Sequence, residues 1–438
     1  MCVRESVNSA MYQPATADYT GNGYHQQSVG IQAAGHRVRR GSRGRPRLHN
    51  RFDRGSNSSN RVSESSRQEN EEDREKPAPP PCTDFDMAYF HSYAHVGIHE
   101  EMIKDRARTE TYRKAIMQHQ SHIAGKVVVD VGCGTGILSI FCAQAGAKRV
   151  YAVDASDIAV QANEVIKANN LSDTVTVLHG RVEDVEIDEE VDVIISEWMG
   201  YMLLYESMLG SVIRARDRWL KPGGLILPSH ATLYMAPVSH PDRYSDSIDF
   251  WRNVYGIDMS AMLPLAKQCA FEEPSVETIT GEHVMTWPHV VKHVDCYTVT
   301  VQELESIMTR FKFKSMMRAP FHGFAFWFDV EFNGPEIFAS PGDALLGTSS
   351  NGHVPDTTQR KKRPNPNEAL VLSTAPEDPP THWQQTLIYF YDPIDVEQDQ
   401  LIEGSVTLSQ SKENARFMNI HLEYASGGRS FVKESVMR

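Results

Sequence analysis

The sequence has 438 residues, of which 40% are hydrophobic and 23% charged, and its formal net charge is -13. This length suffices for two or three structural units with sizeable cores, and the proportions are those of an ordinary globular protein. The absence of any run of about 18 apolar residues excludes a membrane-spanning helix, and the six scattered cysteines show no metal-type spacing, which suits free thiols in the cytosol or the nucleus.

Residues 1–82 are predicted to form a disordered tail rich in Ser, Asn, Gly, Arg and Gln, with a proline-rich linker at 77–81. Eight arginines lie within 37–54, where Asp53 is the single acid, so the rest of the chain is more acidic than the total suggests. An acidic body favours cationic partners and does not require nucleic-acid binding. The basic segment 36–47 is compatible with a nucleic-acid contact, a nuclear address, a methylation target or a solvated tail with no fixed role.

Residues 83–125 show an amphipathic helical pattern and are predicted to form an N-terminal lid, and residues 126–228 alternate between strand and helix. Strands are expected at Val127–Val131, Val150–Asp154, Thr174–His179 and Val191–Ser196, and helices at Ile137–Ala145 and Asp157–Asn169, the second with Ser156 as N-cap. The apolar runs do not alternate with polar residues, which indicates strands covered on both faces and a parallel α/β sheet.

Residues 229–438 are β-rich and predict a barrel or a sandwich. Further strands are expected at Tyr297–Val301, Gln385–Tyr391 and Phe417–Tyr424, and over the alternating aromatic run Phe324–Phe332. Residues 241–263 are predicted to be helical and carry an aromatic cluster. The polar insertion 334–366, with a basic tetrad at 360–363, is predicted to be a mobile loop and a weak nuclear-address candidate.

A glycine-rich turn follows the first strand of the predicted α/β sheet. Gly132, Gly134 and Gly136 allow unusual backbone angles and the close approach of a ligand. Their spacing, G-x-G-x-G, differs from the G-x-G-x-x-G of dinucleotide sites. Asp130, just before the turn, fits poorly beside a pyrophosphate but suits a ligand with an amino group, such as the methionine end of S-adenosylmethionine.

Two more acids follow later strands of the same sheet. Asp154 ends the second strand, where a carboxylate can accept hydrogen bonds from both ribose hydroxyls. Glu183 follows Val182 after the third strand and can receive the adenine amino group. Since open α/β sheets bind ligands at the carboxyl ends of their strands, the glycines and these acids together indicate an S-adenosylmethionine site rather than an ordinary structural turn.

A strongly apolar segment at 196–206 carries two glutamates, Glu197 and Glu206. On one continuous helix they would be about 13.5 Å apart on opposite faces, but Gly200 permits the chain to double back so that the carboxylates converge. A planar guanidinium matches two carboxylates well. The alternative is a pair of solvated or helix-capping acids, which the apolar flanks disfavour.

Segment 196–206 resembles the double-E loop of protein arginine methyltransferases. Tyr89–Tyr93 resembles the lid motif of that family, Thr381–Trp383 resembles its threonine–histidine–tryptophan loop, and 319–324 and 396–399 are most similar to a type I member. The resemblance implies a Rossmann-like S-adenosylmethionine-dependent domain followed by a β-barrel-like domain. It also implies a helical dimerisation arm at 241–263, a homodimer, and asymmetric dimethylarginine as the product.

The resemblance further implies roles for single residues. Its catalytic residues are Glu197, Glu206, His382 and Asp105, and its cofactor-binding residues are Tyr93, His99, Met102, Arg108, Asp130, Gly132, Gly134, Gly136, Asp154, Val182 and Glu183. Asp105 and Arg108, three apart in one predicted helix, are expected to share a face. Arg108 would then hold the cofactor carboxylate, and Asp105 would pair with His382. Most relatives carry Glu where this chain has Asp154.

Four readings remain distinct at this level. A protein arginine methyltransferase acts on exposed arginines, as in histone tails or Arg/Gly-rich segments, in the nucleus or the cytoplasm. An NAD-dependent oxidoreductase is disfavoured by the glycine spacing, and a small-molecule methyltransferase has no need of a double carboxylate. An inactive module that binds arginine-rich segments is the fourth reading.

Overall fold

The computed structural model describes residues 81–334 and 370–438. The predicted tail, apart from its last two residues, and the predicted insertion beyond residue 334 therefore lie outside the described residues. Within the described parts, no helix is both long and apolar enough to cross a membrane.

The described chain begins with a run of short helices. They are α1 (Asp84–Tyr93), α2 (Val96–Lys104), α3 (Arg106–Gln118) and α4 (Gln120–Ile123). Thr83 opens α1 through a capping box with Asp86. Asp105 separates α2 from α3, and its side chain accepts a hydrogen bond from the backbone N–H of Arg108 as the N-cap of α3. Asp105 and Arg108 therefore do not share the face of one helix, and that prediction is wrong.

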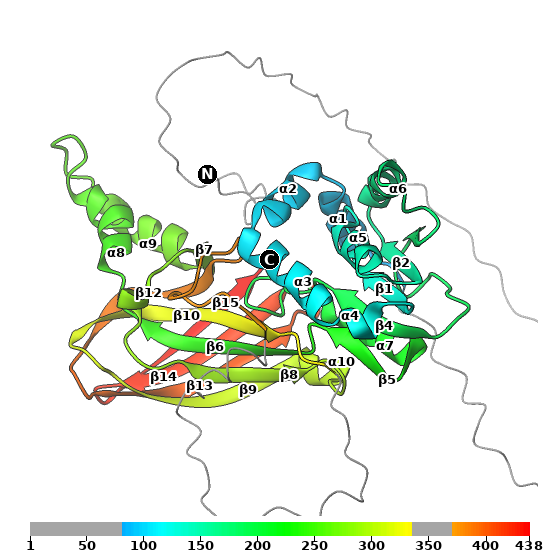
Figure 1. The fold of residues 1–438 in the computed structure, drawn as a ribbon. Helices are drawn as coiled ribbons and strands as arrows, with labels where there is room; N and C mark the ends of the chain where they lie inside the picture. Colours follow the sequence, from blue (N-terminus) through cyan, green and yellow to red (C-terminus); the bar gives the residue numbers. More distant parts are fainter. Residues whose placement is uncertain (1–80, 335–369) are drawn as a thin grey trace, which may run out of the picture. The chain divides into compact units, whose positions relative to one another are not determined.

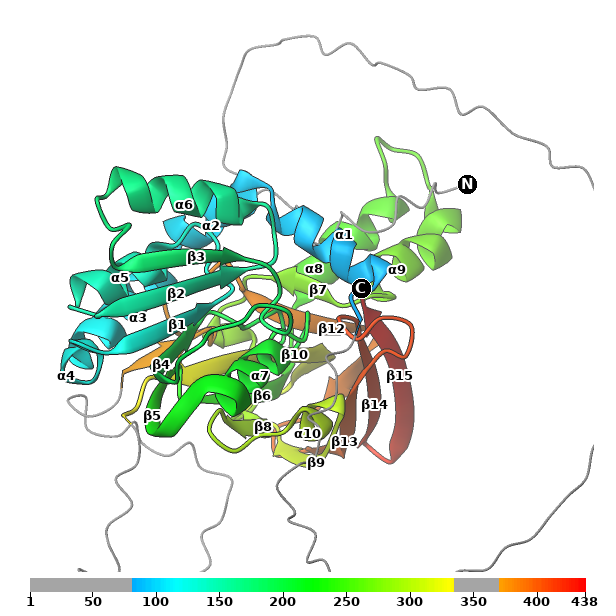
Figure 2. The same ribbon diagram turned by 90° about the vertical axis from the view of Figure 1, so that its right-hand side faces the viewer.

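The parallel α/β sheet is present, with strand order β3-β2-β1-β4-β5. Its strands are β1 (Val127–Val131), β2 (Arg149–Asp154), β3 (Val175–His179), β4 (Val191–Ser196) and β5 (Leu220–Leu227), and its helices are α5 (Ile137–Gln144), α6 (Ile158–Ala168) and α7 (Leu209–Trp219). Every residue of β1 is buried, as expected for a strand covered on both faces. Figure 2 shows the strands of this sheet beside one another, with α6 next to β3.

The N-cap of α6 differs from the prediction. Asp157 occupies the cap position without a side-chain cap bond. Ser156 instead donates its hydroxyl to Oδ1 of Asp154 over 2.6 Å. Its hydroxyl therefore fixes the acid at the end of β2 rather than the start of the helix.

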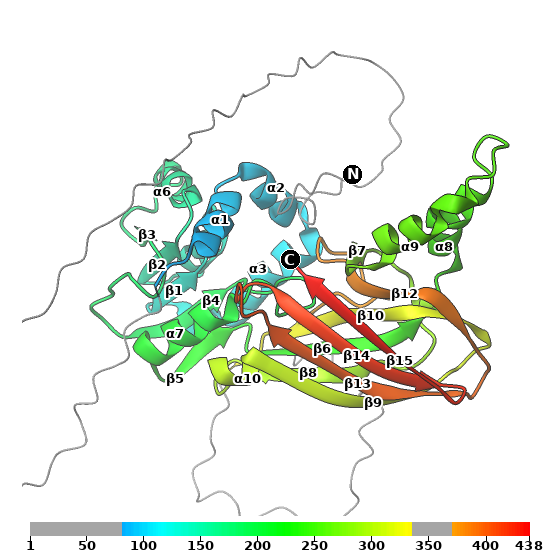
Figure 3. The ribbon, with the colours of Figure 1, turned by 180° about the vertical axis from the view of Figure 1, so that it is seen from behind.

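The second half is built from two antiparallel sheets, seen below the helices in Figures 1 and 3. One has the order β7-β12-β10-β6-β8, with β11 on β10, and the other has the order β15-β14-β13-β9. The strands are β6 (His230–Val238), β7 (Ser275–Glu277), β8 (His289–Asp295), β9 (Ser306–Lys314), β10 (Ala319–Glu331), β11 (Val371–Ser373), β12 (Gln385–Val396), β13 (Leu401–Gln410), β14 (Met418–Ser426) and β15 (Arg429–Met437).

Aromatic rings fill the space between the two antiparallel sheets. Phe321 and Phe324 of β10 meet Phe390 and Tyr424 with ring centroids 4.8 to 6.1 Å apart. The strand predicted from the period-two pattern over Phe324–Phe332 is confirmed as part of β10. Both faces are buried, because Ala325 and its neighbours on the other face pack in a second cluster under the helical arm.

The strand predicted at Tyr297–Val301 is absent. These residues form a turn, and Thr300 caps the short helix α10 (Val301–Glu305) through a capping box with Glu303. The threonine-to-glutamate spacing is the signal that identifies this helix start.

The helical arm is a broken chain of short helices that projects from the antiparallel part, as Figures 1 and 3 show. Its elements are α8 (Pro241–Ser247), η1 (Asp249–Arg252), η2 (Ser260–Met262) and α9 (Leu263–Phe271). Apolar side chains at its tip are exposed, above all Tyr255, which is 98% exposed. A surface of this kind is typical of an interaction site.

Candidate active site

The glycine turn after β1 has the unusual backbone that the sequence predicted. Gly132, Gly134 and Gly136 have φ angles of 71°, 54° and 83°. A Cβ atom on Gly132 would lie 2.1 Å from Cε of Met208. The left-handed backbone angles are what favour glycine in this turn, since the flexible end of the Met208 side chain could move aside.

Asp130 at the end of β1 is fully buried. Its Oδ2 accepts a hydrogen bond from Ser139 over 2.6 Å, while Oδ1 has no hydrogen-bond partner. Burial raises the pKa of Asp130 to about 7. A buried acceptor without a partner is costly, and an amino group of a ligand would satisfy it, so this residue fits the methionine end of S-adenosylmethionine.

Asp154 at the end of β2 holds the glycine turn in place. Its Oδ2 accepts the backbone N–H of Gly134 over 2.8 Å, and its Oδ1 accepts the backbone N–H of Ser156 over 2.8 Å. The sequence suggested only a ligand-facing role for this acid. Its contacts add a structural one, since it joins the glycine turn to the end of β2.

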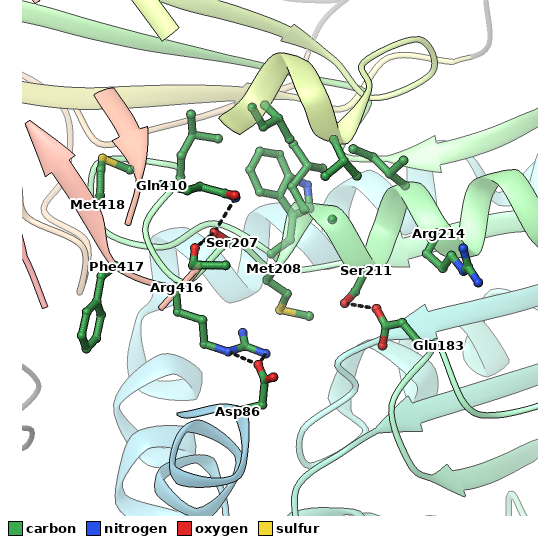
Figure 4. A pocket seen from close by; sticks show the side chains of 18 of the residues that line it. Asp86, Glu183, Ser207, Met208, Ser211, Arg214, Gln410, Arg416, Phe417 and Met418 are labelled. Atoms are coloured by element: carbon green, nitrogen blue, oxygen red, sulfur yellow. Dashed lines mark hydrogen bonds and ion pairs between the residues drawn. The ribbon is translucent and has the colours of Figure 1, made fainter. Parts of the chain in front are cut away.

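Glu183 lies beside a cavity of about 520 Å³. Its Oε1 accepts a hydrogen bond from Ser211 of α7 over 2.8 Å, and Met208 lies nearby, as Figure 4 shows. Val182 next to it is buried. The cavity is lined mostly by apolar side chains from α7 and the antiparallel part, and Asp130, Asp154 and the three glycines are not among its lining residues.

The lid helices contact the glycine turn through His99 of α2. A Cβ atom on Gly134 would lie 3.0 Å from Nδ1 of His99, and Nε2 of the same ring is 2.8 Å from the carbonyl oxygen of Tyr93. The carbonyl of Met102 accepts a hydrogen bond from Nη1 of Arg108 over 3.3 Å. Tyr93, His99, Met102 and Arg108 were predicted to bind the cofactor. They therefore lie together near the carboxyl ends of the parallel strands.

Glu197, which follows β4, forms a buried ion pair with Arg108 of α3. Nη2 of Arg108 is 2.9 Å from Oε2 of Glu197, and Nε donates to the same oxygen over 3.0 Å. The other oxygen, Oε1, accepts the backbone N–H of Met199 over 3.3 Å. The sequence did not predict this ion pair, because no local spacing connects a lid residue with one that lies 89 positions later.

Glu206 is buried beneath the lid. Its Oε2 accepts hydrogen bonds from the hydroxyls of Tyr89 over 2.9 Å and Tyr93 over 2.8 Å. Burial is the main cause that raises the pKa of Glu206 to about 7, and the negative charge of Glu197 adds to the shift. The two carboxylates are therefore close enough to interact. Tyr89 was not among the predicted site residues, although its i, i+4 spacing from Tyr93 places both on one helix face.

The segment between the two glutamates doubles back through left-handed residues. Met202 and Leu203 have φ angles of 54° and 65°, and the N–H of Gly200 donates to the carbonyl of Leu203 over 3.1 Å. A Cβ atom on Gly200 would lie 2.1 Å from the carbonyl oxygen of Tyr205. The reversal therefore needs Gly200 for close approach, while the left-handed angles fall on bulky residues.

His382 and Asp105 form a hydrogen-bonded pair between the antiparallel part and the lid. Nδ1 of His382 is 2.8 Å from Oδ2 of Asp105, and the backbone N–H of His382 donates to the same oxygen over 2.9 Å. Burial would raise the pKa of Asp105, but hydrogen bonds from His382 and Arg108 outweigh it and lower the pKa. Trp383 donates from Nε1 to the carbonyl of Met199 over 2.9 Å, so this loop also contacts the double-glutamate segment.

Comparison with known families and proteins gives a consistent assignment. Residues 229–343 and 359–429 match the family described as the arginine methyltransferase oligomerization subdomain, and residues 113–229 match the ribosomal protein L11 methyltransferase family. A relative from Arabidopsis thaliana, named probable protein arginine N-methyltransferase 6, is 81% identical over 366 residues, which are 82% of this chain and 84% of the relative.

Two solved structures have a similar fold. The Trypanosoma brucei PRMT1 enzyme–prozyme heterotetrameric complex with AdoHcy has a TM-score of 0.67 at 33% identity, over 79% of this chain and all of that one. Protein arginine methyltransferase 10 of Arabidopsis thaliana has a TM-score of 0.66 at 34% identity, over 80% of this chain and all of that one.

Proposed function

Since this chain belongs to the protein arginine N-methyltransferase family and depends on S-adenosylmethionine, we propose that it is a type I enzyme that forms mono- and asymmetric dimethylarginine. The observation that carries the proposal is the pair of glutamates on one reversing loop: Glu206 is buried, and the side chain of Glu197 is 8% exposed. Its substrates are proteins with exposed arginines, among them histone tails and Arg/Gly-rich segments.

The two glutamates have different surroundings, and we infer different tasks from them. Arg108 fixes Oε2 of Glu197, which leaves Oε1 to accept an N–H of the substrate guanidinium. Tyr89 and Tyr93 fix Oε2 of Glu206, which leaves its other oxygen for the opposite side of the guanidinium. Each charge contact at about 4 Å is worth roughly 4 kcal/mol before desolvation costs.

S-adenosylmethionine supplies a methyl group bonded to a positively charged sulfur. When bound, it would supply this methyl group to a nitrogen of the guanidinium that Glu197 and Glu206 hold, and that nitrogen would give up one proton. Holding that nitrogen in line contributes up to about 7–11 kcal/mol by orientation. The His382–Asp105 pair lies at the same site and either accepts the proton or positions the lid.

We propose the cofactor-binding roles that the family resemblance implies. Asp130, whose Oδ1 has no partner, accepts from the amino group, Asp154 from the ribose hydroxyls and Glu183 from the adenine amino group. Arg108 holds the carboxylate with an N–H beyond those that bind Glu197 and Met102. Gly132, Gly134, Gly136, His99, Met102, Tyr93 and Val182 form the surrounding wall.

The exposed arm over 241–263 is proposed as a dimerisation surface, and a homodimer in the nucleus or the cytoplasm as the working form. The exposed Tyr255 and the match to an oligomerization subdomain support the dimer. We also propose domain limits with a lid at 83–125 and a cofactor domain at 126–228, and the bounds of α1 and β5 support them.

The test is incubation of the protein with isotopically labelled S-adenosylmethionine and either a histone-tail or a Gly/Arg-rich peptide, followed by mass spectrometry of the product. We expect asymmetric dimethylarginine. Symmetric dimethylarginine would contradict the type I assignment. Tight binding of the peptide with no methylated product would instead favour the inactive binding module.

A further inference from the structure

The loop 411–417, between β13 and β14, reaches across to Glu206. The backbone N–H of Glu206 donates to the carbonyl of Arg416 over 3.0 Å, and Nη1 of Arg416 donates to the carbonyl of Glu206 over 2.9 Å. The hydroxyl of Ser207 donates to the carbonyl of Ala415 over 2.5 Å. Three hydrogen bonds thus connect this loop of the antiparallel part to Glu206 and Ser207. Two involve the main chain of Glu206, and the third involves the side chain of Ser207.

Glu206 and Ser207 need such support because their φ angles are 74° and 57°. A residue other than glycine in this left-handed region costs about 1–3 kcal/mol, and it persists only when its surroundings enforce it. The loop that supplies the support is itself fixed. Oδ1 of Asn414 accepts the backbone N–H of Arg416 over 3.0 Å, and Phe417 closes the loop through its carbonyl.

The guanidinium of Arg416 also holds α1 of the lid. Its Nε and Nη2 lie 2.9 and 2.8 Å from Oδ1 of Asp86, a contact visible in Figure 4. Its central carbon lies 3.9 Å from the centroid of the Tyr89 ring, a close cation–π contact. Since Tyr89 donates its hydroxyl to Glu206, one arginine touches the lid and the main chain of the glutamate at once.

We propose that Arg416 is a positioning residue for the arginine substrate: it couples closure of α1 over the site to the orientation of the Glu206 carboxylate. The inference rests on the proposed function and extends it, because it assigns part of the substrate-binding step to the antiparallel half of the chain. Lysine cannot replace this arginine, since the planar fork contacts Asp86, Tyr89 and the Glu206 carbonyl at the same time.

The charge of Arg416 acts on the pKa of Glu206, so the pH dependence of the rate distinguishes a positioning role from a purely structural one. The ionisable groups that face Glu206 are Tyr89 and Tyr93 from α1, Arg416 from loop 411–417, and Glu197, Tyr201 and Tyr205 from its own segment. The cation favours the ionised carboxylate and lowers its pKa. Removing Arg416 is therefore expected to raise the pKa of Glu206 further, and to move the acid limb of the rate profile to higher pH.

The experiment compares Arg416→Ala and Arg416→Lys with the wild type, and uses Arg429→Ala as a matched control. Arg429 lies at the opposite end of the β14–β15 hairpin and stacks on Phe431 at 5.6 Å. For Arg416→Ala we expect kcat/KM for an arginine peptide to fall about 10- to 100-fold, with the acid limb at higher pH. Hydrogen exchange of the α1 amides should become faster, and Arg429→Ala should behave as wild type.

Arg416→Lys separates charge from shape: we expect its acid limb to stay near that of the wild type, while kcat/KM falls and α1 exchange rises. An unshifted limb in Arg416→Ala together with unchanged α1 exchange would overturn the proposal, even if the activity fell. If Arg416→Ala does not fold, Asp86→Asn provides the same exchange measurement and must also loosen α1. A wild type that methylates no arginine peptide would refute the proposed function, whereas the exchange comparison would still test the link through Arg416.

Discussion

Arg108 and Glu197 form an ion pair almost fully withdrawn from water, with side chains 7% and 8% exposed and Nη2 2.9 Å from Oε2. Arg108, a residue of the lid, thus already binds one carboxylate oxygen of Glu197, the glutamate that we propose to bind the substrate. Buried pairs of this kind are held in place by the cost of leaving either charge alone. An incoming guanidinium therefore meets a carboxylate whose orientation is set before binding.

Glu197→Gln is expected to lower kcat by at least about 100-fold, since the neutral amide keeps the shape but not the charge that faces the substrate. Calorimetric titration should show that S-adenosylmethionine still binds, because the glycine turn and Asp154 are untouched, although Arg108 loses its charged partner. Glu100→Gln, an exposed residue of α2, serves as control and should be inert. Loss of cofactor affinity in Glu197→Gln would contradict the proposed placement of the substrate.

The rate of methyl transfer should depend on the ionisation of Glu206. Its pKa is raised to about 7, mainly by burial. Because only the ionised carboxylate attracts a guanidinium, kcat/KM should rise as pH increases from 6 to 8, with a midpoint near 7. Measurement of kcat/KM for a short arginine peptide across this pH range tests this predicted dependence. A flat profile would show that Glu206 is ionised throughout or is not required.

The same shift predicts a cost in stability. A carboxyl whose pKa rises from 4.5 to about 7 on folding binds its proton more tightly in the folded state. The associated stability is fully present below pH 4.5 and is lost as pH rises through 7, by roughly 3 kcal/mol in total. The variant Glu206→Gln has no ionisable group at this position and lacks this pH dependence. In denaturant titrations, the free energy of unfolding of the variant minus that of the wild type should therefore increase between pH 5 and pH 8.

Gly200 and Gly210 provide a matched pair of glycine substitutions. Gly200→Ala would place a methyl group 2.1 Å from the carbonyl of Tyr205, whereas a Cβ on Gly210 meets nothing within 4 Å. We expect Gly200→Ala to lower both the melting temperature and kcat/KM. Gly210→Ala, in the helix α7, should be neutral or stabilising by about 0.5–1 kcal/mol. Equal effects of the two changes would show that the reversal of the loop does not depend on close approach.

Much of the fold was predictable because its signals are local. The four strands that end at Val131, Asp154, His179 and Ser196 are mostly apolar, and the family motifs fix the order of the two halves. The errors are also local in origin. The apolar stretch at 297–301 read as a strand, although its threonine and glutamate form a helix cap.

Two contacts that complete the site join residues far apart in sequence, and the residues alone predict neither of them. The pair His382–Asp105, 277 positions apart, was predicted from the family resemblance and is confirmed, whereas the pair Arg108–Glu197, 89 positions apart, was not predicted. No periodicity or spacing indicates such a contact. Similarly, the left-handed angles of Met202 and Leu203 violate residue preference, and only the surrounding packing stabilises them.

The hydrogen bonds between Glu206 and the β13–β14 loop have a consequence for how such proteins can be altered. We therefore expect that the methyltransferase half and its antiparallel companion are not interchangeable modules, since the glutamate that we propose to bind the substrate is held by main-chain hydrogen bonds to the other half. A chimera that joins this chain's first half to the second half of a distant relative would need a loop of matching length and an arginine at the same place.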